Sequence, residues 1–134
     1  MPVDDVRARY LRDRVMTATP AQRVVMLYDR LGLDLTLAQN CPDAASAGAH
    51  LSHAQHVVAE LRSSLDVTAG GPAENLAALY AYLLTELIEV RGGDTDRLPG
   101  VCSIVSTLRD AFATAADQVA AEANAQSSPT AWVG

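Results

Sequence analysis

The chain has 134 residues, of which 49% are hydrophobic and 19% charged, and its formal net charge at pH 7 is −6. This length suits a single domain that buries its core without help from metals or disulfides. The acidic balance argues against nonspecific nucleic-acid binding, which needs a basic face, and the absence of an apolar run of roughly 18 residues argues against a membrane-spanning helix.

Charge is unevenly placed along the chain. The first 30 residues hold six Arg and four Asp, whereas the remainder holds four Arg and twelve acidic residues, and the chain contains no Lys. We interpret residues 1–18 as an N-terminal arm in which Val3, Val6, Tyr10 and Leu11 are spaced as in a short amphipathic helix. A basic arm can fold back on an acidic body, but a solvated helix carrying Arg fits the same pattern.

The first long helix is predicted from its start signal. Thr19 and Gln22 have the spacing of a capping box, and Pro20 stands at the first helical position, where a missing N–H costs nothing. We expect this helix to end near Asn40. Asp43 is then placed to cap a second helix that ends near Leu65.

Glycine-rich breaks separate the second half of the chain into two further helices. Gly70-Gly71-Pro72 ends one segment and starts a helix that we expect to reach Arg91. The segment 92–96 breaks the chain again and caps a fourth helix that ends near Asn124. We expect Pro99-Gly100 to delay the start of this helix by about a turn. Residues 125–134, with Trp132, are predicted to form a loose tail.

Apolar residues recur at alternating steps of four and three in each helix, which is the spacing of bundle seams. The seams are Val24, Tyr28, Leu31, Leu35 and Ala38; Ala47, Leu51, Ala54, Val58, Leu61 and Leu65; Leu76, Tyr80, Leu83, Leu87 and Val90; and Val101, Val105, Leu108, Phe112, Ala115 and Val119. Short loops between long helices make neighbours antiparallel. We therefore predict an all-α fold, an up-down four-helix bundle over residues 19–124.

The first helix carries more apolar surface than its seam needs. On a wheel of about 100° per residue with Val24 at zero, Met26, Leu33 and Leu37 fall at about 200°, 180° and 220°. The third helix is also broad, because its apolar arc continues through Leu84 and Ile88. We predict that Met26, Leu33, Leu37, Leu84 and Ile88 line a protein-binding groove, since such a stripe is seldom left bare on a soluble monomer.

Three occupants fit this stripe equally well by spacing. Tyr10 and Leu11 of the arm are the expected cover if the chain protects itself. A second copy of the chain or an apolar helix of another protein fits the same pattern. Spacing alone does not distinguish a permanent cover from a removable one.

Chemical motifs are scarce. His50, His53 and His56 spread over about 120° of one helix, so solvated histidines are expected rather than a metal site. A histidine phosphotransfer bundle using His56 is the alternative function, although its chemistry usually needs a nearby Lys. Cys41 and Cys102 are expected to be reduced thiols of a cytoplasmic protein, because the N-terminus does not resemble a signal peptide. We expect neither catalysis nor a metal or cofactor.

Several motifs, in order over residues 10–117, resemble the flagellin export chaperones of the FliS family. The motifs are Tyr10; Val15-Met16-Thr17-Ala18-Thr19-Pro20; Val25-Met26-Leu27-Tyr28-Asp29; His53-Ala54; Glu60-Leu61; Leu65-Asp66; Gly70-Gly71; Asn75-Leu76; Leu79-Tyr80-x-Tyr82; and Leu108-Arg109-Asp110-Ala111-Phe112. The chain departs from the family pattern at Arg30, where Gly is usual, at Phe112, where Trp is usual, and at Glu89-Val90-Arg91, where an Ala-Asn pair is common.

The resemblance implies a cytoplasmic chaperone that binds the disordered C-terminal segment of flagellin, prevents premature polymerisation and supports export by the flagellar type III apparatus. It implies that the arm covers the groove until the client displaces it. A component of the export gate is a further candidate partner, and we expect a monomer or a weak dimer. Tyr28, Tyr80 and Phe112 are interpreted as core residues, and Asp29, Arg109 and Asp110 are expected to orient the client or cap contacts.

Overall fold

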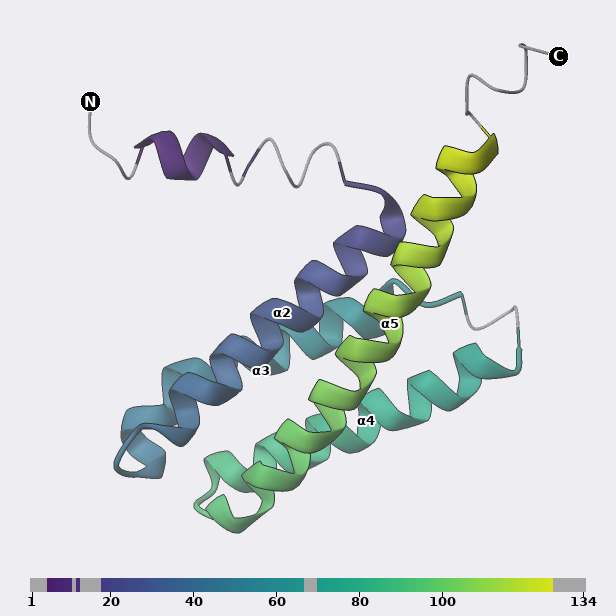
Figure 1. Cartoon of the computed structure of the whole chain (residues 1–134). Coiled ribbons are helices and arrows are strands. Elements are labelled where there is room, and N and C mark those ends of the chain that lie inside the picture. The colour runs from purple at the N-terminus through teal and green to yellow at the C-terminus, as the bar shows by residue number, and fades with distance from the viewer. Residues whose placement is uncertain (1–4, 11, 13–17, 67–69, 127–134) are drawn as a thin grey trace, which may run out of the picture.

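The chain folds into an antiparallel bundle of four long helices, which confirms the predicted fold class (Figure 1). The computed structural model describes residues 5–10, 12, 18–66 and 70–126. The elements are α2 (Pro20–Gln39), α3 (Ala44–Ser63), α4 (Pro72–Arg91), the 3-10 helix η2 (Thr95–Arg97) and α5 (Leu98–Gln126). Residues 5–10 and 12 are also helical.

The predicted caps form at the starts of α2 and α3. The Gln22 amide N–H donates to the Thr19 hydroxyl at 3.1 Å, and the Thr19 amide donates back to the Gln22 side chain at 2.9 Å. The Ser46 amide N–H donates to the Asp43 carboxylate at 2.8 Å, and this bond holds the pKa of Asp43 below its ordinary value. These contacts satisfy amides that a helix start leaves without partners.

The start of α5 differs from the prediction. Gly93, at φ 118°, turns the chain after α4, and the short η2 precedes α5. Pro99 and Gly100 lie inside the first turn of α5 and do not delay it by a turn. Proline is tolerated there because an amide in the first turn has no partner within the helix.

The helices pack in a ring in which α2 contacts α3 and α5, and α3 contacts α4. The fourth side is more open, because α4 contacts η2 and makes less contact with α5 than α2 does. In Figure 1, α5 crosses α4 near η2 and then runs toward the start of α2. Consequently, α2 and α4 occupy diagonal positions in the ring, and α5 packs chiefly against α2.

The core contains most of the predicted seam residues. The fully buried large side chains are Tyr28, Leu31, Leu35, Leu51, Val58, Leu61, Tyr80, Leu83, Leu87, Val90 and Val101. The α5 seam is wrong beyond Phe112, because Ala116 is buried while Ala115 and Val119 are exposed. The reason is that α5 runs beside α2 at this point (Figure 1), where Ala113 and Ala116 line a hollow shared with α2, so the buried face of α5 turns toward α2.

Three aromatic residues join three helices at the centre of the bundle. The hydroxyls of Tyr28 on α2 and Tyr80 on α4 form a buried hydrogen bond, and the Tyr28 ring stacks on Phe112 of α5 with ring centroids 5.2 Å apart. Burial raises the pKa of both tyrosines, so both hydroxyls stay protonated at neutral pH. This cluster agrees with the interpretation of the three residues as core.

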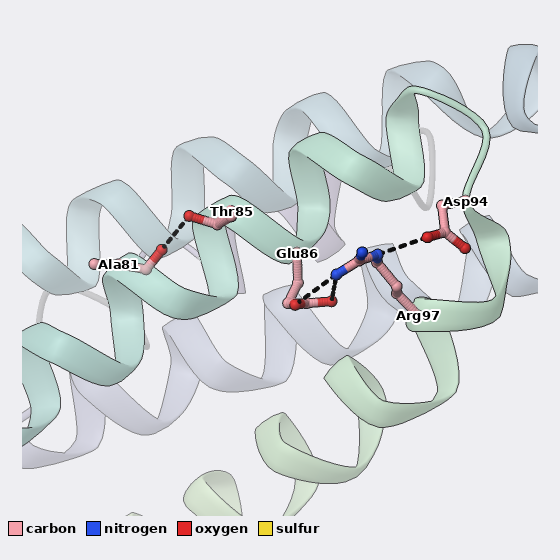
Figure 2. Close-up of polar contacts among 5 residues, drawn as sticks. All are labelled: Ala81, Thr85, Glu86, Asp94 and Arg97. Carbon is pink, nitrogen blue, oxygen red and sulfur yellow. Dashed lines mark hydrogen bonds and ion pairs between the residues drawn. The ribbon is translucent and has the colours of Figure 1, made fainter.

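Two buried carboxylates link elements at the edges of the core. Asp34 of α2 forms a hydrogen bond with the His53 ring of α3. Glu86 of α4 accepts two hydrogen bonds from Arg97, at 3.0 and 3.2 Å, while the same guanidinium donates to Asp94 at 2.7 Å (Figure 2). Arg97 thus holds the connection between α4 and α5 against α4.

At the chain ends, α5 continues to Gln126, so the first two residues predicted as tail are helical. Trp132 and the rest of that tail lie outside the described residues. Among the described helices, none is both long enough and apolar enough to cross a bilayer.

We predict that Tyr80→Phe lowers the free energy of unfolding by about 1–3 kcal/mol, because it leaves the buried Tyr28 hydroxyl without its partner. The double variant Tyr28→Phe/Tyr80→Phe should lose less than the single variant, since neither hydroxyl then needs a partner. Urea denaturation of the three proteins measures both differences. A double variant less stable than Tyr80→Phe would contradict this account.

Candidate functional site: the outer face of α2 and the groove between α2 and α5

Within the part of the chain that the structure describes, helix α2 packs mainly against α3 on one side and α5 on another. Its third side faces solvent and carries two large apolar side chains, Leu33 at 50% exposure and Leu37 at 40%. The core residues Leu31 and Leu35 on the same helix are buried. The predicted surplus of apolar surface on this helix is therefore present in the fold.

A groove runs along the boundary between α2 and α5 and contains two hollows of about 410 and 340 Å³. The first hollow is lined by Ala18, Gln22, Val25, Met26, Asp29, Arg109, Ala113, Ala116 and Asp117. The second is lined by Tyr28, Asp29, Gly32, Leu35, Thr36, Cys102, Val105, Ser106 and Arg109. Met26, which sequence analysis grouped with Leu33 and Leu37, belongs to the wall of the first hollow.

One ion pair marks the junction of the two hollows. Nε of Arg109 lies 2.8 Å from Oδ1 of Asp29, and both residues line both hollows. The hydrogen bond to Asp29 raises the pKa of the Arg109 guanidinium further above its ordinary value. Asp110 approaches the same guanidinium at 3.5 Å. The pair therefore lies at the surface between the two hollows of the groove.

The two α4 residues predicted for the binding groove lie elsewhere. Ile88 is 57% exposed, and Leu84 is half-buried against the core. Because α2 and α4 are diagonal in the ring, these two residues do not share a groove with Leu33 and Leu37. The five residues therefore lie in two apolar patches, one on α2 and one on α4, and their use in protein binding stays a prediction.

The predicted cover leaves the patch on α2 open in this structure. Tyr10 is 65% exposed, and Leu11 lies outside the described residues. The other described arm residues, 5–9 and 12, are exposed as well. The apolar side chains of α2 and of the described arm are thus both accessible to other molecules.

The family-motif residues fall into two groups. Thr19 and Pro20 start α2, while Leu27, Leu79 and Leu108 are half-buried and Tyr28, Tyr80 and Phe112 form the central aromatic cluster. Asp29, Arg109 and Asp110 instead meet at the groove. Sequence analysis named these three residues but missed the α5 wall of the groove. The signal that could have indicated contact between α2 and α5 was the opposite charge of Asp29 and Arg109, which lie in two separate motifs.

The histidines and cysteines do not assemble into a site. His53 bonds to Asp34, whereas His56 is exposed and makes no hydrogen bond or ion pair with any described residue. Over residues 5–10, 12, 18–66 and 70–126, no group of three His, Cys, Asp or Glu side chains is arranged to hold a metal. Cys41 and Cys102 are free thiols.

Comparison with known proteins gives one result. No curated protein matches the sequence. The family model described as flagellar protein FliS matches residues 4–119, which include all four long helices up to the last turns of α5.

We predict that Cys102 reacts slowly with iodoacetamide at pH 7, because burial in the groove wall raises its thiol pKa above the ordinary value and leaves little thiolate. The alkylation rate of a Cys41→Ser variant, followed by mass spectrometry, should keep rising above the pH at which an ordinary cysteine thiol is fully ionised. As a control, the Cys102→Ser variant gives the alkylation rate of Cys41 alone. A Cys102 rate that levels off below that pH would contradict the prediction.

Proposed function

Because the chain belongs to the FliS family of flagellar export chaperones, we propose that it binds the disordered C-terminal segment of flagellin in the cytoplasm. In this role it prevents premature polymerisation of flagellin and supports export by the flagellar type III system. The chain then acts by binding alone, with no catalytic step and no cofactor. A component of the export gate is the second partner that we propose.

The observation that carries this proposal is the apolar outer face of α2. Leu33 and Leu37 are half-exposed although they stand on a helix whose inner side is completely buried. Burial of such a side chain from full exposure is worth roughly 1.5–3 kcal/mol, so half-exposed leucines retain about half of that for a partner. Together with Met26 in the adjacent groove, they form one apolar strip on which a client helix packs.

An extended client explains why the apolar residues form two patches. Leu84 and Ile88 on α4 are separated from the strip on α2 by the width of the bundle. A segment that is disordered when free reaches both patches by wrapping around the molecule, and it gains affinity from area rather than from one deep pocket. The ordering of the segment costs free energy, which a large contact area offsets.

The N-terminal arm is proposed as a removable cover of this surface. Ala18, the last residue of the arm, lines the first hollow of the groove. Tyr10 of the arm is accessible, as are Leu33 and Leu37 on the bundle. The arm therefore begins beside the strip that it is proposed to cover, and Tyr10 and Leu11 are the side chains that would pack there.

We predict that Leu33→Asp/Leu37→Asp weakens binding of the flagellin C-terminal segment by at least about thirty-fold. The change removes apolar contact and places two charges in the interface, which costs about 2 kcal/mol or more. Calorimetric titration with the purified segment measures the dissociation constant. Circular dichroism should show unchanged helix content, since both side chains face solvent.

Val119→Asp is the matched control, because Val119 is a half-exposed apolar residue on α5 that lines neither hollow. This variant should bind the segment as the wild type does. Equal affinities for the wild type and the double variant would remove the α2 face from the proposal, and no binding by the wild type would remove the function itself.

Deletion of residues 1–16 should raise the affinity for the flagellin segment, because the client would no longer compete with the arm. A three- to ten-fold decrease in the dissociation constant corresponds to about 0.6–1.4 kcal/mol of competition. The deletion should leave the thermal midpoint nearly unchanged, since the described arm residues are exposed. Loss of the cooperative unfolding transition would show instead that the arm is part of the folded core.

A further inference from the structure

The ion pair in the groove differs from the ion pairs of the two buried carboxylates in this bundle. Asp34 and Glu86 are buried, and each forms its hydrogen bonds with another side chain of the bundle. The side chains of Arg109 and Asp29 are 41% and 49% exposed, and they stand where the two hollows meet. Whatever lies along the groove must cover this pair.

The pair has hydrogen-bonding capacity left for a ligand. A guanidinium carries five N–H donors, and Arg109 uses its Nε–H on Asp29. Oδ1 of Asp29 accepts that bond, and Oδ2 makes no hydrogen bond with any described residue. A ligand that covers the pair therefore meets unused donors and an unused acceptor side by side.

This pair contributes little to the stability of the contact between α2 and α5. A half-exposed ion pair contributes little to stability in water, and the contacts around Tyr28, Leu35 and Val105 already hold the two helices together. Under a bound segment the surroundings change, because water leaves and unsatisfied charged groups become costly. A segment that lacks a polar group at this point consequently binds with lower affinity, because it leaves the charged groups of the pair unsatisfied.

The charges also restrict which polar group fits. An acidic side chain placed there would be repelled by Asp29, Asp110 and Asp117. A basic one would be attracted by these carboxylates, but it has no acceptor for the unused N–H donors of Arg109, which would be left unsatisfied under the bound segment. A carboxamide has an acceptor oxygen and a donor nitrogen on one planar group and carries no net charge. It can therefore satisfy both partners of the pair without repulsion.

On the basis of the proposed function, we infer that Arg109 and Asp29 together select an Asn or Gln side chain of the bound flagellin segment. The carboxamide oxygen accepts from the guanidinium of Arg109, and the carboxamide nitrogen donates to the Asp29 carboxylate. Small or apolar side chains on either side of this residue occupy the two hollows. The ion pair thereby fixes the position at which the segment lies along the groove.

A double-mutant cycle tests the assignment. Arg109→Gln should weaken segment binding about ten-fold, and replacing one particular Asn or Gln of the segment by Ala should weaken binding to the wild type by a similar factor. The same Ala replacement should have little further effect on binding to Arg109→Gln, because the two groups act as a pair. Coupling of Arg109 to an acidic or basic residue of the segment instead, or to none, would overturn the inference.

The charge-swapped variant Asp29→Arg/Arg109→Asp separates recognition of a neutral group from recognition of a charge. The swap keeps the ion pair with reversed polarity, and a carboxamide can turn by half a rotation to match it. Binding should return to within about three-fold of the wild type and depend weakly on salt. A swap that binds no better than Arg109→Gln would point to a charged ligand group and overturn the inference.

Controls separate this inference from the proposed function and from loss of folding. Arg62→Gln removes an exposed arginine of α3 that lines neither hollow, and it should bind as the wild type does. In the Cys41→Ser background, the bound segment should slow alkylation of Cys102, which lines the second hollow. Segment binding without protection of Cys102 would overturn this inference alone, whereas absence of binding by the wild type would overturn the proposed function as well.

Discussion

The position of Tyr28 constrains the rest of the bundle. Its hydroxyl bonds to Tyr80 on the diagonal helix α4, and its ring stacks on Phe112 of α5. This orientation points one side of α2 into the core, and the contacts with α3 and α5 occupy the two flanks. The apolar residues left over, Leu33 and Leu37, consequently face outward. The surplus on α2 is therefore a geometric result of how the core is built, since a helix in a ring of four has no fourth neighbour.

Burial distinguishes the ion pairs of Asp34 and Glu86 from the half-exposed pair of Asp29 and Arg109 in the groove. Asp34 and Glu86 are inside the protein, where a carboxylate without a partner is unfavourable, so loss of the His53 or Arg97 side chain would destabilise the fold. Asp29 and Arg109 are hydrated, and the fold does not require their contact in the same way. Their location beside two hollows gives them a natural role in recognition, which is the basis of the inferred carboxamide contact.

The helices were predictable because their signals are local. The capping box at Thr19, the Asp43 cap and the Gly70–Pro72 break each act within a few residues, and α2 and α4 begin and end within one residue of the predicted bounds. The overall packing of the helices followed from short connections between them. The exception in α5 has a tertiary cause, since Ala116 replaces Ala115 in the core only because α5 leaves α4 and follows α2.

The site was predictable only in part, for the same reason. Periodicity identifies which side of a helix is apolar, and it correctly placed Leu33 and Leu37 away from the core. Periodicity does not say which helix lies beside that side, so Leu84 and Ile88 were assigned to a groove that the diagonal arrangement of α2 and α4 excludes. Beside Arg109 and Asp117, the groove wall on α5 includes small residues such as Ala113 and Ala116, which carry no distinctive sequence signal.

Two patches on different faces suit a long flexible client better than a compact one. A compact ligand seated on Leu33 and Leu37 would not reach Ile88, whereas an extended chain covers about 3.3–3.6 Å per residue and needs few residues to pass from α2 to α4. Each patch is shallow and contributes modestly, so affinity depends on their being occupied together through one chain. Release of one patch then lowers the affinity of the remainder, and a client held this way can be removed stepwise from one end without unfolding the bundle that holds it.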